Sequence, residues 1–467
     1  MNARLEGSGP SDERPPAFPA WPDPSPLLDA YRALTPGSAQ LAKRALGVLA
    51  NGVSTDTRVF EPYGIFIDRA QGREKWDVDG NRYLDFFGGH GALMLGHSHP
   101  KVVAAVRQAF QNGIQFAANH PGELLWAEAI QRCFPSGERV RFTGSGSEAT
   151  LLAIRMARAY SGRAKLVRIM SHYHGWHDLA VSGYSGQFDG SAAPGVLPEI
   201  AANTLLVRPD DIAGLKACLA QHAGQIAAII VEPLGAHFGH TPTSDEFLLE
   251  AAAEARRRGV LLIFDEVISA FRVGLGGMQG YLGLRPDLTC LAKIAAGGMP
   301  GGVVIGSAEV MSVLDSKDAL GHPNPRKVLH QGTFTGNPVT AAAAVVTIAE
   351  IADGDLCARA SQLAAGAREA LNALFERRAA GWLAYGRFSS LNVLPIDPVR
   401  RDPRLLSQAD YMARDLTRLG ALRMALNLEG VDIGARGAAF LSGVHTQDDV
   451  DRLVEAFDRA LARLEAR

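Results

Sequence analysis

Two residues near the middle of the chain have types and positions that suit covalent and acid–base chemistry. Asp265 ends an apolar run over residues 260–264, and Lys293 ends a second short apolar run in a loop that continues to Gly297-Gly298. Five consecutive apolar residues favour a strand that is buried on both faces of a parallel sheet. Ligands bind at the carboxyl ends of the strands in open α/β sheets, so a carboxylate and an amine at two such ends are candidates for cofactor chemistry.

An aspartate and a lysine in this relation are what pyridoxal phosphate chemistry requires. The carboxylate keeps the pyridine nitrogen of the cofactor protonated, so that the ring accepts electrons, while the amine forms a Schiff base and then moves the Cα proton. Taken singly, the residues are explained as well by an N-capping aspartate and a solvated lysine. Their joint placement favours the cofactor.

A third stretch is suited to holding a phosphate. The sequence Phe142-Thr143-Gly144-Ser145-Gly146-Ser147-Glu148-Ala149 follows a predicted strand over residues 139–142 and opens a helix. Free N–H groups at a helix start, two hydroxyls and glycines that allow close approach make an anion cradle, and a well-capped helix is the alternative. No lysine follows the glycines, which excludes a P-loop. A glycine and hydroxyl turn over residues 330–338 also suits an anion.

Two further strand ends carry aromatic or ionisable side chains. Tyr173 lies in the sequence HYHGW after a predicted strand over residues 165–170. Its ring is able to stack on a cofactor or to belong to the core. Glu232 follows an apolar run over residues 227–231, and His237 lies in the loop after it. Either group is a candidate to reach the phenolic oxygen of the cofactor, although a lone histidine is more often structural.

The composition argues against several other classes of protein. The chain has 467 residues, a net charge of −2, 47% hydrophobic residues and 21% charged residues. These values suit a globular enzyme of more than one domain, and argue against nucleic acid or an acidic membrane as the main partner. The sequence shows no apolar run near the roughly 18 residues of a membrane span, and a secretory signal is not expected. Reduced thiols, a cytoplasmic location and no metal site are expected from four cysteines without a disulfide or metal-ligand spacing, at positions 133, 218, 290 and 357.

Four segments are expected along this α/β chain. Residues 1–26 have seven prolines from position 10 onward and are expected to form a disordered arm. Residues 27–95 form an N-terminal segment with a hairpin signal at Asp79-Gly80-Asn81. Helices and strands alternate over residues 96–350, as in a parallel sheet wrapped by helices, and the longer amphipathic helices of residues 351–467 predict a smaller α+β domain.

The motifs together carry a family resemblance that covers nearly the whole chain from about residue 40. In order and spacing, GSGSEA, HYHGW, FDEV, the Lys293 loop and QGTFTGNP resemble the class III, fold-type I, pyridoxal phosphate transaminases. The resemblance implies a large cofactor-binding domain with a mostly parallel seven-stranded sheet and a small α+β domain. It also implies a homodimer that completes its sites across the subunit interface.

The same resemblance implies a role for each motif residue. Lys293 would be the Schiff-base lysine, Asp265 the partner of the pyridine nitrogen, and Val267 a contact on one face of the ring. Tyr173 would stack on the other face. The phosphate would be held by Ser145, Gly146 and Ser147, together with Thr333 of a neighbouring subunit.

Two branches of the class resemble the chain in different stretches. The glutamate-1-semialdehyde aminomutases share Gly52-Val53-Ser54, residues 77–81 and Arg58, which would hold a substrate carboxylate. Where they carry a functional glutamate, this chain reads Gly434-Ala435-Arg436-Gly437, which has no acid. The D-phenylglycine (D-4-hydroxyphenylglycine) aminotransferases are the more similar branch. The stretches that resemble them lie mostly outside the cofactor motifs, at residues 55–60, 86–93, 237–239, 382–388 and 429–434.

The sequence thus predicts stereo-inverting transamination of D-arylglycines with 2-oxoglutarate, to give an arylglyoxylate such as benzoylformate and L-glutamate. One lysine must then handle Cα hydrogens of opposite configuration, so the carboxylate and the side chain exchange positions between the two substrates. The candidates for groups that serve both positions are Arg58, His90, His237 and Arg436. The alternatives are an aminomutase, a β-amino acid transaminase, an amino acid racemase and a non-catalytic cofactor-binding protein.

Overall fold

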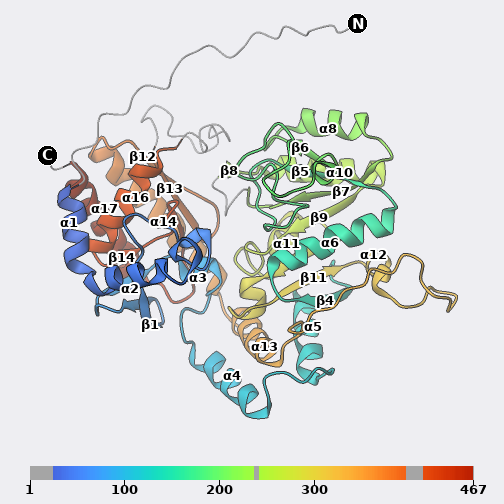
Figure 1. Ribbon diagram of the computed structural model, residues 1–467, viewed down its shortest axis with the longest axis horizontal. Coiled ribbons are helices and arrows are strands. Elements are labelled where there is room, and N and C mark those ends of the chain that lie inside the picture. Colours follow the sequence, from blue (N-terminus) through green and yellow to red (C-terminus); the bar gives the residue numbers. More distant parts are fainter. Residues whose placement is uncertain (1–24, 236–240, 396–413, 466–467) are drawn as a thin grey trace, which may run out of the picture.

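The computed structural model describes residues 25–235, 241–395 and 414–465. The proline-rich arm predicted for residues 1–26 lies almost entirely outside the described residues, and His237 also lies outside them. Figure 1 shows two groups of elements side by side. One group contains the central sheet and its helices, and the other contains the first and last elements of the described chain.

A seven-stranded sheet forms the centre of the larger group, in the order β4-β11-β10-β9-β7-β5-β6. The neighbours from β10 to β6 pair in parallel, and β11 runs antiparallel to both of its neighbours. The mostly parallel seven-stranded sheet predicted from the sequence is therefore present. Its strands are β4 (Arg139–Thr143), β5 (Lys165–Ile169), β6 (Thr204–Val207), β7 (Ile226–Val231), β9 (Leu261–Asp265), β10 (Leu288–Ala292) and β11 (Gly302–Gly306).

Helices cover both faces of this sheet, so β7, β9 and β10 are buried along their whole length. On one face, α6 packs Leu152 and Met156 into a cluster with Ile263 of β9. On the other face, Leu215 of α8 and Phe247 of α10 pack into a cluster with the alternate residues of β7 and β9. The helices of this group are α4 (Pro100–Asn112), α5 (Pro121–Cys133), α6 (Gly146–Ser161), α7 (Pro198–Ala201), α8 (Ile212–Gln221), α10 (Asp245–Arg258), α11 (Gly277–Leu282), α12 (Ala308–Met311) and α13 (Pro338–Ala352).

The second group brings the two ends of the described chain together. Its first sheet has the order β1-β2-β3-β14, and the predicted hairpin at Asp79-Gly80-Asn81 joins β2 to β3. Its second sheet, β12-β13-β15, is antiparallel. The strands are β1 (Ile67–Gln71), β2 (Glu74–Asp77), β3 (Arg82–Asp85), β12 (Trp382–Tyr385), β13 (Ser390–Pro395), β14 (Val431–Asp432) and β15 (Ala438–Phe440). The helices are α1 (Ser25–Leu34), α2 (Pro36–Leu46), α3 (Gly88–Gly91), α14 (Leu356–Arg377), α16 (Leu416–Leu428) and α17 (Gln447–Glu465).

The core of the second group joins sequence-distant elements. Leu453 and Phe457 of α17 lie in one buried cluster with Leu371 of α14, Leu422 of α16 and Leu84 of β3. The N-terminal segment therefore packs with the C-terminal part of the chain, while the domain boundaries given above stay a prediction. None of the described helices has the length and apolar character that crossing a membrane requires.

Candidate active site

Asp265 and Lys293 come together because β9 and β10 are neighbouring parallel strands. Asp265 ends β9 opposite Cys290 of β10, and β10 ends at Ala292, so Lys293 leaves the same edge of the sheet. Lys293 begins a 3-10 turn, Lys293–Ala296, with a φ of 52°. Few residues other than glycine adopt this left-handed conformation, and such residues are concentrated at functional sites.

Burial changes the acid–base properties of both groups. It lowers the pKa of Lys293 to about 8, although the charges of Asp265 and Glu232 act in the opposite direction. The amine therefore loses its proton more readily than an exposed lysine, as a nucleophile and proton acceptor must. Burial raises the pKa of Asp265 to about 7, against a hydrogen bond from the Val267 amide and the charge of Lys293. A cation beside Asp265 would favour its ionised form.

The imidazole of His174 anchors Asp265. Its Nδ1 lies 2.8 Å from Oδ2 of Asp265, and Oδ1 accepts a hydrogen bond from the Val267 amide at 3.2 Å. Burial holds the pKa of His174 well below its usual range, so the ring is neutral at pH 7 and donates through Nδ1 to Asp265 when that carboxyl group is ionised. This residue was not predicted, because the strand before it, β5, is separated from β9 by β7 in the sheet.

Tyr173 and Glu232 meet beyond the ends of β5 and β7. The Tyr173 amide donates a hydrogen bond to Oε1 of Glu232, and the Glu232 amide donates to Nδ1 of His172 at 2.9 Å. The buried guanidinium of Arg168, on β5, donates to the His172 carbonyl and so fixes the loop that follows β5. A hydrogen bond also joins the hydroxyls of Tyr173 and Ser147. The predicted stacking residue is therefore held against the predicted phosphate cradle.

The first turn of α6 forms that cradle. Ser145 is the N-cap, and its Oγ accepts the Glu148 amide at 3.2 Å. Within the described residues, no hydrogen bond to protein occupies the amides of Gly146 and Ser147. A Cβ at Gly146 would lie 3.0 Å from both methyl groups of Val267, so glycine allows the close approach here. Two open amides at the start of a 16-residue helix suit a phosphate.

His90 lies in a strained turn near the amine. Gly88, Gly89, His90 and Gly91 all have positive φ, and His90 has a φ of 58°. Burial lowers the pKa of His90 to about 4, and the charge of Lys293 adds to this effect. The ring is therefore neutral at pH 7. Its side chain packs against Phe87 with ring centroids 4.5 Å apart.

Arg58 and Arg436 are exposed and reach the site from different segments. Nη1 of Arg58 donates to Oγ of Ser54 at 2.8 Å, and the charge of Arg58 also acts on His90. Nη1 of Arg436 donates to Oη of Tyr184 at 3.2 Å. The ring of Tyr184 packs against Tyr173, with centroids 5.0 Å apart. Both arginines thus lie near groups of the predicted site.

Arg272, a further residue that was not predicted, lies between β9 and α11 and joins the larger group of elements to the turn of His90 and to two other segments of the second group. It is buried, and its guanidinium donates to the carbonyl of Gly91 at 2.6 Å, to Oγ of Ser389 at 3.0 Å and to the carbonyl of Leu441 at 3.2 Å. Its positive charge also lowers the pKa of Lys293. The signal in the sequence was only that Arg272 follows the FDEV motif.

Thr333 lies on the surface. Its carbonyl accepts a hydrogen bond from the Gln115 side chain, and among the described contacts none joins it to the α6 cradle of the same chain. This position leaves the predicted role in a neighbouring subunit untested.

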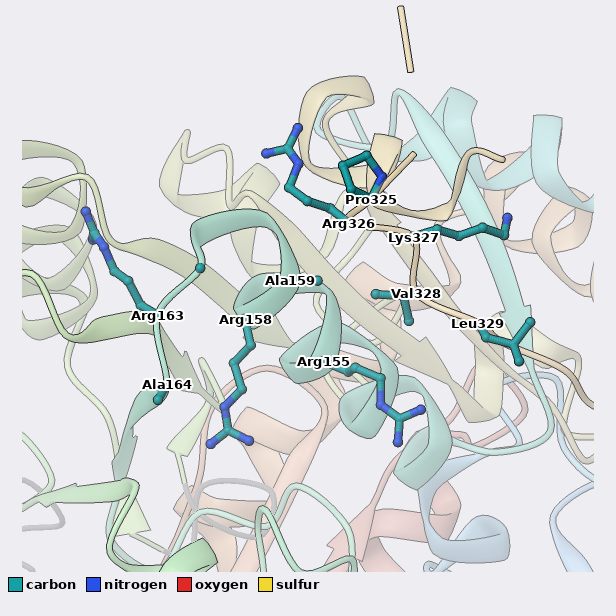
Figure 2. A pocket seen from close by; sticks show the side chains of 11 residues that line it. Arg155, Arg158, Ala159, Arg163, Ala164, Pro325, Arg326, Lys327, Val328 and Leu329 are labelled. Carbon is teal, nitrogen blue, oxygen red and sulfur yellow. The ribbon is translucent and has the colours of Figure 1, made fainter. Parts of the chain in front are cut away.

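A basic hollow lies apart from these residues, at the other end of α6, with a volume of about 730 Å³. Figure 2 shows that Arg155 and Arg158 point away from Arg326 and Lys327. Arg326 and Lys327 donate to the carbonyls of Tyr160 and Leu314. The cations therefore do not converge on one position where an anion would bind.

Comparison with known proteins places the chain in a family. The model of the family described as aminotransferase class-III matches residues 56–381, more than half of the chain. A glutamate-1-semialdehyde 2,1-aminomutase of Sorangium cellulosum (strain So ce56) is 38% identical in an alignment 448 residues long, which covers 94% of this chain and 98% of that protein.

Two solved structures are similar over almost their whole length. A β-phenylalanine aminotransferase from Variovorax paradoxus has a TM-score of 0.82 and 31% identity, over 94% of this chain and 97% of that one. A structure described as a transaminase with PLP bound has a TM-score of 0.82 and 30% identity, over 92% and 98%. These similarities confirm the predicted fold-type I architecture. The chain belongs to the class III aminotransferases.

Proposed function

We propose that this protein transfers the amino group of a D-arylglycine to 2-oxoglutarate. Pyridoxal phosphate is the cofactor, and the site fits it. The open amides of Gly146 and Ser147 suit its phosphate, the anchored carboxylate of Asp265 suits a protonated ring nitrogen, and the amine of Lys293 suits its aldehyde. Val267 and Tyr173 would hold the two faces of the ring.

The chemistry divides between the cofactor and the chain. Pyridoxal phosphate, when bound, supplies an aldehyde that bonds to amines and a ring that takes up the electron pair of a broken Cα–H bond. Lys293 would first hold the cofactor covalently, and its freed Nζ would then take the proton from Cα of the amino acid and deliver it to the former aldehyde carbon of the cofactor. His174 would keep the Asp265 charge in place throughout.

The observation that carries the substrate proposal is the pair of exposed arginines beside the site. 2-Oxoglutarate has two carboxylates, and Arg58 and Arg436 supply two guanidinium groups that can each bind one through paired hydrogen bonds. An arylglycine has one carboxylate and a flat apolar ring. Phe87 packs against His90 and lies 6.2 Å from Phe440 between ring centroids, so aromatic surface adjoins the polar groups.

The D-arylglycine part of the proposal is supported by the sequence stretches outside the cofactor motifs. It is also supported by the arginine at position 436, in the region where the aminomutases resembled above carry a functional glutamate. A cytoplasmic location stays a prediction from the composition.

We further propose a homodimer. Large apolar side chains are exposed at the end of α4 and just after it, at Phe110, Ile114 and Phe116, and on a neighbouring segment at Phe334. The side chain of Asn337 donates to the Ile114 carbonyl, which holds the two segments together. A second copy that covers this surface would also place Thr333 next to a subunit boundary, as its predicted role requires.

An aminomutase is the second candidate, because a protein of that name is 38% identical over 94% of the chain. An aminomutase moves the amino group within one molecule and needs no second keto acid. The two candidates therefore differ in a measurable requirement.

The test adds D-phenylglycine alone to the protein with bound cofactor. Transamination converts the bound cofactor to pyridoxamine phosphate, releases benzoylformate in one equivalent, and stops until 2-oxoglutarate is added. Chiral analysis then identifies the glutamate that forms, and we expect L-glutamate. Equal use of L-phenylglycine, or turnover of glutamate 1-semialdehyde with no turnover of D-phenylglycine, would contradict the proposal.

A further inference from the structure

A cluster of charged side chains, some partly and some fully buried, adjoins the segments that carry the predicted substrate residues His90 and Arg436. Nζ of Lys75 on β2 lies 3.1 Å from Oδ1 of Asp85 and 2.5 Å from Oδ2 of Asp432. Nε of Arg423 on α16 donates to Oδ1 of Asp432 at 3.0 Å, and Nε2 of His97 lies 2.7 Å from Oδ2 of Asp85. Lys75, Asp85 and Asp432 are all buried. We call these five residues the Lys75 cluster.

The two carboxylates meet because of the strand register. β3 and β14 pair in parallel, with Asp85 directly opposite Asp432. Like charges directly opposite each other destabilise a sheet, and burial disfavours both ionised forms. The Lys75 ammonium contacts both carboxylates, and its charge, with that of Arg423 at Asp432, holds the pKa of both carboxyls below the usual range despite burial. Lys75 therefore stabilises the pairing of β3 with β14.

The β3 side of this pairing leads into the turn of His90. Oδ1 of Asp85, which Lys75 contacts, also accepts the amides of Phe87 at 2.9 Å and Gly88 at 3.3 Å. These amides begin the left-handed turn in which His90 has a positive φ. Three hydrogen bonds to one carboxylate oxygen thus set where the turn starts.

The β14 side leads into the loop of Arg436. Asp432 ends β14 four residues before Arg436. The Gly434 amide donates a hydrogen bond to the Ala438 carbonyl at 2.7 Å, and this bond closes the loop that contains Arg436. The third segment is reached through Arg423, whose guanidinium lies 4.9 Å from the ring centroid of Phe60, two residues after Arg58. The Lys75 cluster therefore contacts the three described segments that carry predicted substrate residues.

We propose that Lys75 is a positioning residue for substrate binding, whose ammonium fixes the pairing of β3 with β14 and so the spacing between His90 and Arg436. The proposal rests on the proposed function, because it takes these residues to bind substrate carboxylates. Lys75 itself does not touch the substrate. Its effect is to hold two binding groups, which come from opposite ends of the chain, in one geometry.

The test uses protein with bound cofactor and glutarate, a dicarboxylate that has neither an amino nor a keto group. Lys75→Met removes the ammonium but keeps the length of the side chain. Because this variant leaves two buried carboxylates facing each other, it is paired with the double variant Lys75→Met, Asp432→Asn, which removes one charge of each sign. Lys101→Met is the matched control, since Lys101 forms an exposed ion pair with Glu350.

We expect both Lys75 variants, where folded, to bind glutarate at least about tenfold more weakly by calorimetry and to show a raised KM for both substrates. We expect kcat to change less than KM, and the absorption spectrum of the bound cofactor to stay as in the wild type. Lys101→Met should match the wild type throughout.

A folded double variant that binds glutarate as tightly as the wild type would overturn the positioning role and leave the proposed function standing. Loss of cofactor binding in step with glutarate binding would also overturn it, because that pattern indicates general loss of structure. A wild-type protein that neither binds glutarate nor transaminates D-phenylglycine would overturn the proposed function, and the positioning role with it.

Discussion

Nδ1 of His174 lies 2.8 Å from Oδ2 of Asp265, and both side chains are buried. His174 directly follows Tyr173, so one loop sets both the ring that would stack on the cofactor and the charge that would face its ring nitrogen. Nε2 of His174 is buried and forms no hydrogen bond within the described residues. The contact with Asp265 is thus the polar interaction that defines the orientation of this imidazole.

Replacement of His174 by phenylalanine should keep a ring of similar size and remove the hydrogen bond to Asp265. We expect kcat to fall by about tenfold or more, because the carboxylate is no longer held in one orientation, while the affinity for the cofactor changes less. Steady-state kinetics of the protein saturated with cofactor would measure this. His322→Phe, at an exposed histidine, is the control, and equal kinetics in the two variants would contradict the anchoring role.

Replacement of Lys293 by alanine should separate covalent attachment from binding. Reduction with borohydride followed by mass spectrometry should show the cofactor attached to the wild-type chain and not to Lys293→Ala. The variant should still hold the cofactor through the cradle and lose at least about a thousandfold in rate, because the proton acceptor is missing. Lys327→Ala, at an exposed lysine, is the control. Turnover near the wild-type rate in Lys293→Ala would remove the central assignment.

The stability of the cofactor-free protein should depend on pH through Asp265. Burial raises the pKa of this carboxyl from 3.8 to about 7. Between these values the folded protein binds more protons than the unfolded chain, so the contribution of Asp265 to the free energy of unfolding falls as the pH rises. In Asp265→Asn this fall is absent.

The variant should therefore gain stability relative to the wild type from about pH 4 to pH 7, by at most about 1.4 kcal/mol per pH unit. Urea unfolding of both cofactor-free proteins at several pH values would measure the difference. A difference that stays constant across this range would show that the pKa of Asp265 is not raised.

The sequence was sufficient for features that depend on local pattern and on parallel topology. Asp265 and Lys293 each follow an apolar run, and parallel neighbouring strands place their carboxyl ends at one edge, so their meeting was predictable. The first turn of α6 was predictable because glycines and hydroxyls follow a strand and open a helix.

Contacts that depend on pairing between distant segments could not be predicted from the sequence. Lys75 and Asp432 are 357 residues apart, and Arg436 and Tyr184 are 252 residues apart. Nothing local to Asp432 indicates that β14 pairs with β3 or that Asp85 lies opposite in the register. The same limit applied to His174, whose partner belongs to a strand that is not the neighbour of β5.

The last prediction concerns Arg58 as a carboxylate-binding group in both half-reactions. A guanidinium binds a carboxylate through two parallel hydrogen bonds, which an ammonium cannot reproduce, so Arg58→Lys keeps the charge and loses the geometry. If the substrates exchange the positions of carboxylate and side chain, Arg58 meets a carboxylate of both the arylglycine and 2-oxoglutarate. We therefore expect the apparent Kd to rise by about tenfold in each half-reaction, measured separately by stopped-flow absorption.

Arg69→Lys is the matched control, because Arg69 is an exposed arginine of β1 whose guanidinium lies over the ring of Trp76. A defect confined to 2-oxoglutarate would assign Arg58 to the distal carboxylate alone and contradict the exchange of positions. Unchanged half-reactions in Arg58→Lys would show instead that the described contact with Ser54 is the whole role of this side chain.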